Sequence, residues 1–103
     1  MFDKLSQAQS MAEEIKRKLD LIEVEGEAGN GKVKVIANAN RRIKDVIISD
    51  EMMHPERKEE LQDLVQIAFE KAMKTAEDIS QSEMNALMSS MMPGGLGSLF
   101  GKK

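Results

Sequence analysis

The strongest constraint on the fold lies mid-chain, where apolar and charged residues alternate on both sides of Gly29-Asn30-Gly31. From Ile22 to Ala28 every second residue is small or apolar, and the residues between them are glutamates. Residues 32–38 repeat the alternation with lysines at the outward positions. A period of two is typical of half-buried strands, and Asn-Gly favours a tight turn because both residues tolerate positive φ. The pattern predicts a β-hairpin.

A third strand is predicted after a turn at residues 38–41. Its apolar residues, which fall on both faces, are Ile43, Val46, Ile47 and Ile48. Two helices can cover only one face of a three-stranded sheet well, so we expect a second copy of the chain to contact the other face. These four residues are the predicted dimer interface.

Helical periodicity flanks the strands on both sides. Before them, apolar residues recur in steps of three and four, at Leu5, Ala8, Ala12, Ile15, Leu19 and Ile22. This spacing indicates lengthwise packing on another helix, from the same chain or from a second copy. After them, Pro55 suits the first position of a long helix whose apolar stripe continues to Met91, and Pro93-Gly94-Gly95 ends it. The predicted fold class is α+β: a helix, a three-stranded antiparallel sheet and a long helix.

The length of 103 residues gives room for a single α+β domain, which we place at residues 1–92, with 93–103 as a flexible Gly-rich tail. A domain this short buries only about 60–65% of the surface that its unfolded chain exposes. A monomer would therefore be marginally stable, and a homodimer is expected.

Several classes of protein are excluded by what the sequence lacks. There is no cysteine, so disulfides, thiol catalysis and thiolate metal sites are excluded. No signal peptide is visible, and no apolar run approaches the roughly 18 residues of a membrane span. We expect a cytoplasmic protein with no membrane association.

No catalytic constellation is visible either. His54 is the only histidine and is expected to belong to the turn before the long helix. Glu13-Glu14 and Glu59-Glu60 are adjacent on helices, so the two carboxylates of each pair point in different directions. The glycines of the hairpin lead into a strand and lack the helix N-terminus of a phosphate loop. We expect no enzyme, no cofactor, no metal and no small-molecule substrate.

Charge is unevenly distributed along a chain whose formal net charge is -3. Residues 32–44 hold five basic residues and no acidic one, whereas residues 56–83 have an acidic surplus. The cations that could neutralise the phosphates of a nucleic acid are Lys16, Arg17, Lys18, Arg41, Arg42 and Lys44. Two alternatives remain open: lysines protect strand edges, and cations near a helix C-terminus suit the helix dipole. No aromatic residue interleaves these cations, so contacts would be to the phosphate backbone rather than to stacked bases.

A methionine-rich strip closes the long helix, formed by Met84, Met88, Met91 and Met92. Flexible, polarizable methionines suit either core or dimer packing or an adaptable binding surface. The tail residues Leu96, Leu99 and Phe100 suit either disorder or a short docking segment.

The chain resembles the YbaB/EbfC family of bacterial nucleoid-associated proteins over nearly its whole length. The resemblance rests on the Gln-, Met- and Lys-rich opening helix, the strands Gly31-Lys32-Val33-Lys34-Val35 and Lys44-Asp45-Val46-Ile47-Ile48, the segment from Leu61 to Glu77, and the Gly-Leu-Phe tail. It implies a tweezer-shaped homodimer with joined sheets, located in the nucleoid, that binds DNA and influences nucleoid organisation and gene expression.

Two departures from the family pattern stand out. The turn after the second strand reads Asn38-Ala39-Asn40-Arg41 where relatives often carry Gly, and we expect an asparagine to supply the positive φ. Phe69-Glu70-Lys71-Ala72 replaces a common Asn-Asp-Ala, so no role of that polar patch is carried over. The leading prediction is a homodimer that binds duplex DNA with little sequence specificity. The alternative is a protein-interaction adaptor with no direct DNA binding.

Overall fold

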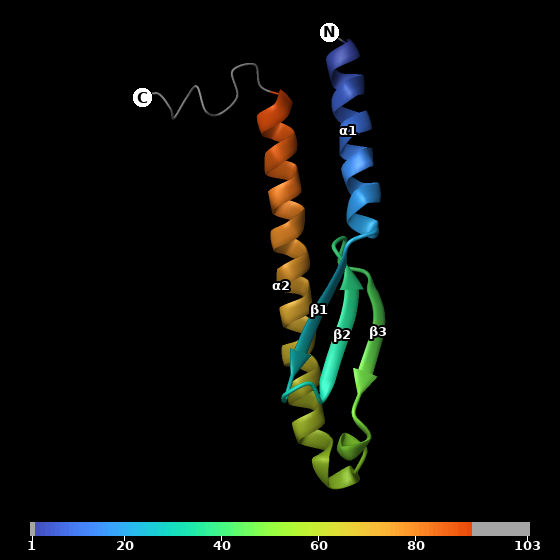
Figure 1. Cartoon of the computed structure of the whole chain (residues 1–103), viewed down its shortest axis with the longest axis vertical. Helices are drawn as coiled ribbons and strands as arrows, with labels where there is room; N and C mark the ends of the chain where they lie inside the picture. The colour runs from blue at the N-terminus through green and yellow to red at the C-terminus, as the bar shows by residue number, and fades with distance from the viewer. Residues whose placement is uncertain (1, 92–103) are drawn as a thin grey trace, which may run out of the picture.

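The computed structural model describes residues 2–91, with side chains for residues 5–90. Its elements are α1 (Phe2–Asp20), β1 (Glu23–Ala28), β2 (Val33–Asn38), β3 (Ile43–Ile48), the short 3-10 turns η1 (Asp50–Met52) and η2 (Pro55–Arg57), and α2 (Lys58–Met91). The three strands form one antiparallel sheet in the order β1-β2-β3. The α+β fold predicted from the sequence is confirmed (Figure 1).

The predicted hairpin joins β1 to β2. Ala28 pairs with Val33, so the loop has four residues rather than two. Gly29, Asn30 and Gly31 all have positive φ, of 65°, 56° and 85°. The Asn-Gly signal thus identified the turn correctly, and a second glycine lengthens it.

Strand β3 pairs only with β2 and forms an edge of the sheet. Val46 lies opposite Val35 on the face that α2 covers, whereas Ile47 lies opposite Lys34 on the open face. The prediction that β3 is apolar on both faces is therefore confirmed. A bulge between Ile36 and Ala37 shifts the register, and Ala37 pairs with Ile43. The apolar residues of β3 remain largely exposed in the single chain.

Helix α2 packs on the sheet through a stripe of small residues. Ala68, Ala72 and Ala76 recur every four residues and are fully buried. Gly26 of β1 lies against this stripe, and a Cβ there would come within 2.5 Å of the backbone N of Ala72. The short side chains let the helix backbone approach the strand closely, which fixes α2 over β1 and β2.

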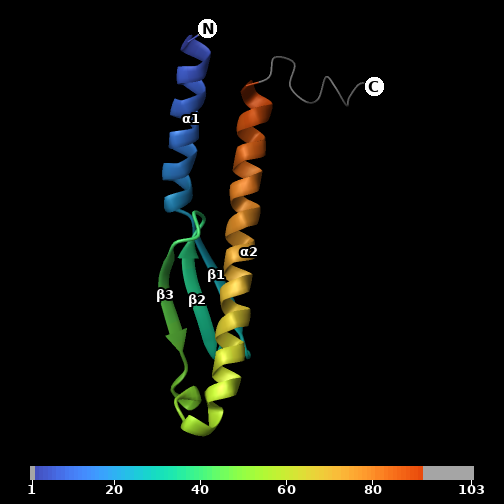
Figure 2. The ribbon, with the colours of Figure 1, turned by 180° about the vertical axis from the view of Figure 1, so that it is seen from behind.

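Helix α1 does not help to cover the sheet, in contrast to the expectation that two helices would share one face. It extends beyond the sheet and runs beside the C-terminal half of α2, as both ribbon views show (Figures 1 and 2). An ion pair of 3.1 Å between Lys18 and Glu83 links the two helices. The expected helical partner is thus found within the chain, but Leu5 and Ala12 of the seam remain exposed.

The resulting molecule is long and thin, with extents of 62 × 32 × 16 Å. Its radius of gyration is 19.3 Å, against about 13 Å expected for a compact domain of this length. The largest fully buried side chains are only Met52, Val33 and Val35. No helix in the described part of the chain is long and apolar enough to cross a membrane.

Two further predictions concern the two ends of α2. Pro55 begins the 3-10 turn η2, and the α-helix itself begins three residues later at Lys58. Met84 and Met88 are exposed on α2. The Met91 and Met92 side chains and the predicted tail at 93–103 lie outside the described residues.

Candidate nucleic-acid interface

The turn between β2 and β3 carries the predicted cations Arg41 and Arg42. Both are exposed, and Lys44 follows them in β3. The turn closes through a hydrogen bond from Arg41 N to Asn38 O of 2.9 Å and another from Asn38 N to Arg42 O of 2.9 Å. The arginines are therefore held on a structured turn rather than on a loose loop.

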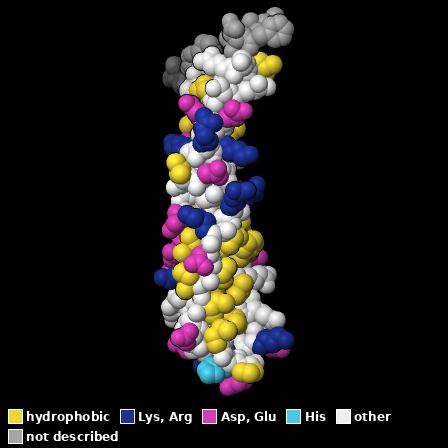
Figure 3. All heavy atoms as spheres, turned by 90° about the vertical axis from the view of Figure 1, so that its right-hand side faces the viewer, with side chains coloured by type: hydrophobic (Ala, Val, Ile, Leu, Met, Phe, Trp, Pro, Cys, Tyr) yellow, Lys and Arg dark blue, Asp and Glu magenta, His cyan; other side chains and the backbone are white. Residues whose placement is uncertain are grey.

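This turn docks on the end of α1. The Asn40 side-chain amide donates to the backbone carbonyl of Lys16 at 2.8 Å. The Ala39 backbone N–H lies 3.1 Å from Leu19 O and 2.9 Å from Ile22 O. The structure therefore unites two basic segments that lie more than twenty residues apart in the sequence. In the space-filling view, Lys and Arg side chains gather above an apolar strip (Figure 3).

The six predicted cations differ in whether they are already neutralised. Lys18 pairs with Glu83 at 3.1 Å, and Lys44 pairs with Glu23 at 3.6 Å. The other four have no ion-pair partner among the residues that the structure describes; they are Lys16, Arg17, Arg41 and Arg42. We call these four residues the basic surface. They are free to neutralise phosphates without first breaking an ion pair.

Lys32 and Lys34, also counted in the basic run of the hairpin, do not join this surface. They sit at the opposite end of β2, a strand whose six residues span about 20 Å at about 3.3 Å per residue. Lys32 lies 3.4 Å from Glu51, and Lys34 is paired in the sheet with Glu27. These two lysines are better explained as ordinary solvent-facing charges than as phosphate contacts. Because β2 is the central strand of the sheet, they do not protect a strand edge.

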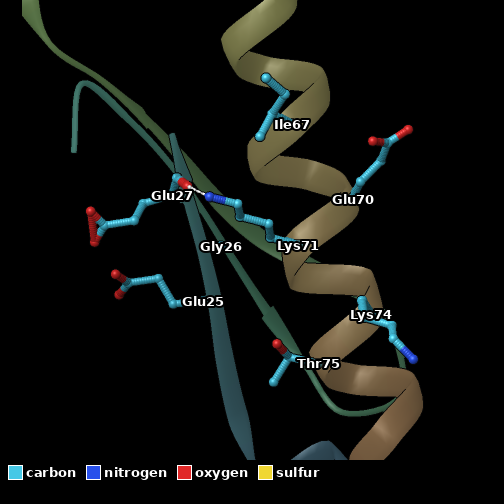
Figure 4. Close-up of a pocket in the computed structure, with 8 residues that line it drawn as sticks. All are labelled: Glu25, Gly26, Glu27, Ile67, Glu70, Lys71, Lys74 and Thr75. Carbon is cyan, nitrogen blue, oxygen red and sulfur yellow. Dashed lines mark hydrogen bonds between the residues drawn. The ribbon is translucent and has the colours of Figure 1, made fainter. Parts of the chain in front are cut away.

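A groove of about 620 Å³ between the β1 edge and α2 is a second candidate site. Figure 4 shows Lys71 reaching from α2 to the backbone carbonyl of Glu27, where it donates at 3.1 Å. Lys74 donates to Asp78 at 2.9 Å, and this hydrogen bond raises the pKa of the Lys74 ammonium. Both cations of the groove are thus occupied by protein acceptors, and its remaining charged groups are glutamates. The groove does not suit a polyanion.

The residues considered for catalysis do not come together in one site. His54 is exposed in the turn before η2, as predicted. The side chains of Glu13, Glu14, Glu59 and Glu60 are exposed on their helices. Within the described part of the chain, no three His, Cys, Asp or Glu side chains are grouped to hold a metal ion.

Sequence reasoning missed the polar residues that assemble the basic surface. Asp20 Oδ1 accepts from the side-chain amides of Asn40 at 2.6 Å and Asn38 at 3.4 Å. The expectation that an asparagine would supply the positive φ of this turn is wrong, because the residue with positive φ is Arg41, at 67°. The asparagines instead act through their side chains, and the Asn-x-Asn pattern before the arginines was the available signal.

A model of the YbaB/EbfC DNA-binding family matches residues 1–91. The chain belongs to this family. A nucleoid-associated protein of Afipia carboxidovorans is 38% identical over 97 residues, which cover 94% of this chain and 92% of that protein. A nucleoid-associated protein of Bacillus cytotoxicus is 45% identical over 75 residues, covering 72% of this chain and 69% of that protein.

The fold of this YbaB/EbfC protein is also found in a crystal structure of an uncharacterized protein from Helicobacter pylori. The TM-score is 0.71 at 22% identity, with 76% of this chain and 82% of that chain covered. The resemblance inferred from the sequence is therefore confirmed, and the YbaB/EbfC family is one of DNA-binding proteins rather than enzymes.

Proposed function

We propose that this YbaB/EbfC protein is a cytoplasmic, nucleoid-associated homodimer that binds the phosphate backbone of duplex DNA with little sequence specificity. In this role it would influence nucleoid organisation and gene expression. The observation that carries the proposal is the docking of the turn bearing Arg41 and Arg42 on the end of α1, which makes one basic surface on an acidic chain. Phosphate contacts fix a protein on DNA without reading its sequence.

The exposed apolar residues on both faces of the edge strand β3 support dimerisation. Ile43, Val46 and Ile47 are 43–45% exposed. Phe69 of α2 is 43% exposed, and it lies about 200° around the helix from Ile67, which lines the groove beside β1. Phe69 therefore faces the β3 side, where Figure 3 shows an apolar strip along the molecule. A second copy packed on this strip, with Ile48 at its border, would add the core that the single chain lacks.

Pairing of the two β3 edges would join the sheets. The helical pairs α1 and α2 would then project as the arms of a tweezer. Each dimer would carry two basic surfaces, one on each copy, at the base of the arms. Lys18 and Lys44, now paired with glutamates, would lie at the border of each surface and could exchange their carboxylate partners for phosphates.

The test is the salt dependence of binding to duplex DNA. Each neutralised phosphate contributes a slope of about -0.9 to log K against log salt, so four cations give about -3.6 and both surfaces of a dimer about -7.2. Two duplexes of unrelated sequence should bind equally well. A slope near zero would contradict backbone binding, and a large preference for one duplex would contradict weak specificity.

The exposed Met84 and Met88 favour a second candidate, an adaptor that binds an apolar or basic protein partner and contacts DNA only indirectly. Reversing the charges of Arg41 and Arg42 to glutamate separates the two functions. Loss of DNA binding with an intact dimer supports direct binding. Unchanged association with DNA, together with a partner protein lost on Met88→Ser, supports the adaptor.

A further inference from the structure

Arg41 holds a backbone conformation that arginine disfavours. Its φ of 67° lies in the left-handed region, where the Cβ of a residue other than glycine approaches the carbonyl oxygen too closely. Such conformations persist only where the surroundings fix them, and they cluster at functional sites. The strain would disappear with glycine at this position, so an arginine here needs a reason.

Asn38 fixes the turn that carries this strain. Its side chain is almost fully buried, and Oδ1 accepts from the backbone N–H of Asn40 at 2.9 Å and of Arg42 at 3.0 Å. The Arg41 N–H donates to the backbone carbonyl of the same residue. Three successive backbone N–H groups of the turn therefore donate to one asparagine. These hydrogen bonds restrain the turn in this backbone conformation.

Asp20 ties the turn to α1. It accepts from the amides of both asparagines, and the Asn40 amide also reaches the Lys16 carbonyl at 2.8 Å. Asp20 is exposed, and its carboxylate contacts the turn that carries Arg41 and Arg42. Its negative charge alone would repel a polyanion, so the position of this carboxylate implies another role.

We propose that Asp20 and Asn38 are positioning residues that hold Arg41 in its strained conformation beside Lys16, so that the turn and the helix end engage one DNA backbone together. This inference rests on the proposed DNA binding. Arg41 supplies a phosphate contact, and the strain of its backbone is retained for that contact. The DNA affinity gained when Asp20 aligns the cations exceeds the affinity lost through repulsion between its carboxylate and the phosphates.

The first test is Arg41→Gly, which should change folding and binding in opposite directions. Glycine relieves the left-handed strain, so the melting temperature rises by a few degrees. DNA affinity falls, and in a dimer the salt slope becomes less steep by about 1.8, or about 0.9 for each copy. Asn30→Gly is the matched control, since Asn30 has a φ of 56° in the other turn. Because asparagine tolerates this region, Asn30→Gly should change the melting temperature less than Arg41→Gly does, and it should leave the slope unchanged.

The second test compares two changes at Asp20. Both remove a negative charge, so electrostatics alone predicts tighter DNA binding for each. Asp20→Ala also removes the acceptor of both asparagine amides, and we expect roughly five- to tenfold weaker binding. Asp20→Asn keeps an acceptor oxygen and should bind at least as tightly as wild type.

The outcomes are distinct from those that test DNA binding itself. A wild-type protein without salt-dependent binding overturns the proposed function. A wild type that binds, with Asp20→Ala binding as tightly or more tightly, overturns the positioning role. An unchanged affinity of Arg41→Gly overturns the phosphate contact. All affinities are measured below the melting temperature of each variant.

Discussion

Gly26→Ala should push α2 away from the sheet and so destabilise the fold. The added Cβ would collide with the backbone oxygen of Ala68 and lie 2.5 Å from the backbone N of Ala72. Ordinary contact begins near 3.4 Å, so the helix has to move by about 1 Å. Because both obstacles are main-chain atoms, no side chain can rotate to make room. The buried layer between α2 and the hairpin then loses its close packing.

Overpacking a tight core costs about 1–3 kcal/mol, and a collision with main-chain atoms belongs at the upper end. A loss of about 3 kcal/mol lowers the melting temperature of a domain of this size by roughly 12–24 °C. Thermal unfolding followed by circular dichroism at one fixed protein concentration measures it, since dimerisation makes the midpoint concentration-dependent.

The matched control is Gly31→Ala. Gly31 has a φ of 85°, but its new Cβ would meet nothing closer than the Glu27 carboxylate at 3.5 Å. The cost is then conformational only, about 1 kcal/mol. Equal losses for the two variants, or a stable Gly26→Ala protein, would refute the reasoning that close approach of α2 requires glycine in β1.

The remaining predictions concern the dimer face, the arms and the core. Val46→Asp should give a monomer in analytical ultracentrifugation because it buries a charge in the proposed interface, whereas Ile67→Asp, equally exposed on the other side of α2, should leave the dimer intact. Glu83→Gln should cost less than about 1 kcal/mol of stability because the ion pair is solvent-accessible on its Lys18 side. By freeing Lys18 it should steepen the salt slope of DNA binding by about 0.9 per chain. Met52→Ala should lower the free energy of unfolding by about 2–5 kcal/mol in urea titration, since Met52 is fully buried; a loss under 1 kcal/mol would contradict its place in the core.

Elements with a strong local signal could be predicted from the sequence. The hairpin followed from alternation around Asn30-Gly31, and β3 followed from its apolar run. The position of α1 could not be predicted, because its seam shows that it packs on a helix but not where along that helix. The four-residue step of Ala68, Ala72 and Ala76 gave helical spacing, yet only the structure shows Gly26 lying against it.

The charged residues of the candidate site could be predicted from the sequence, but the way the fold brings them together could not. The arginines of the turn and the cations of α1 were visible as two clusters, and local sequence gave no reason to join them. Their union depends on hydrogen bonds between residues far apart in the sequence, such as Asn40 and Lys16, which are 24 positions apart. Periodicity describes contacts within an element, whereas a polar contact of this kind depends on the tertiary fold. The strain at Arg41 was missed for the same reason.

The central claim is that one surface made from α1 and the β2–β3 turn meets the DNA backbone. NMR titration of isotope-labelled protein with a short duplex tests it directly, because each backbone amide reports its own environment. We predict that the signals of residues 16–18 and 39–42 shift together, saturate at the same DNA concentration, and return when salt is raised. Shifts confined to α2, or to only one of the two segments, would contradict the claim.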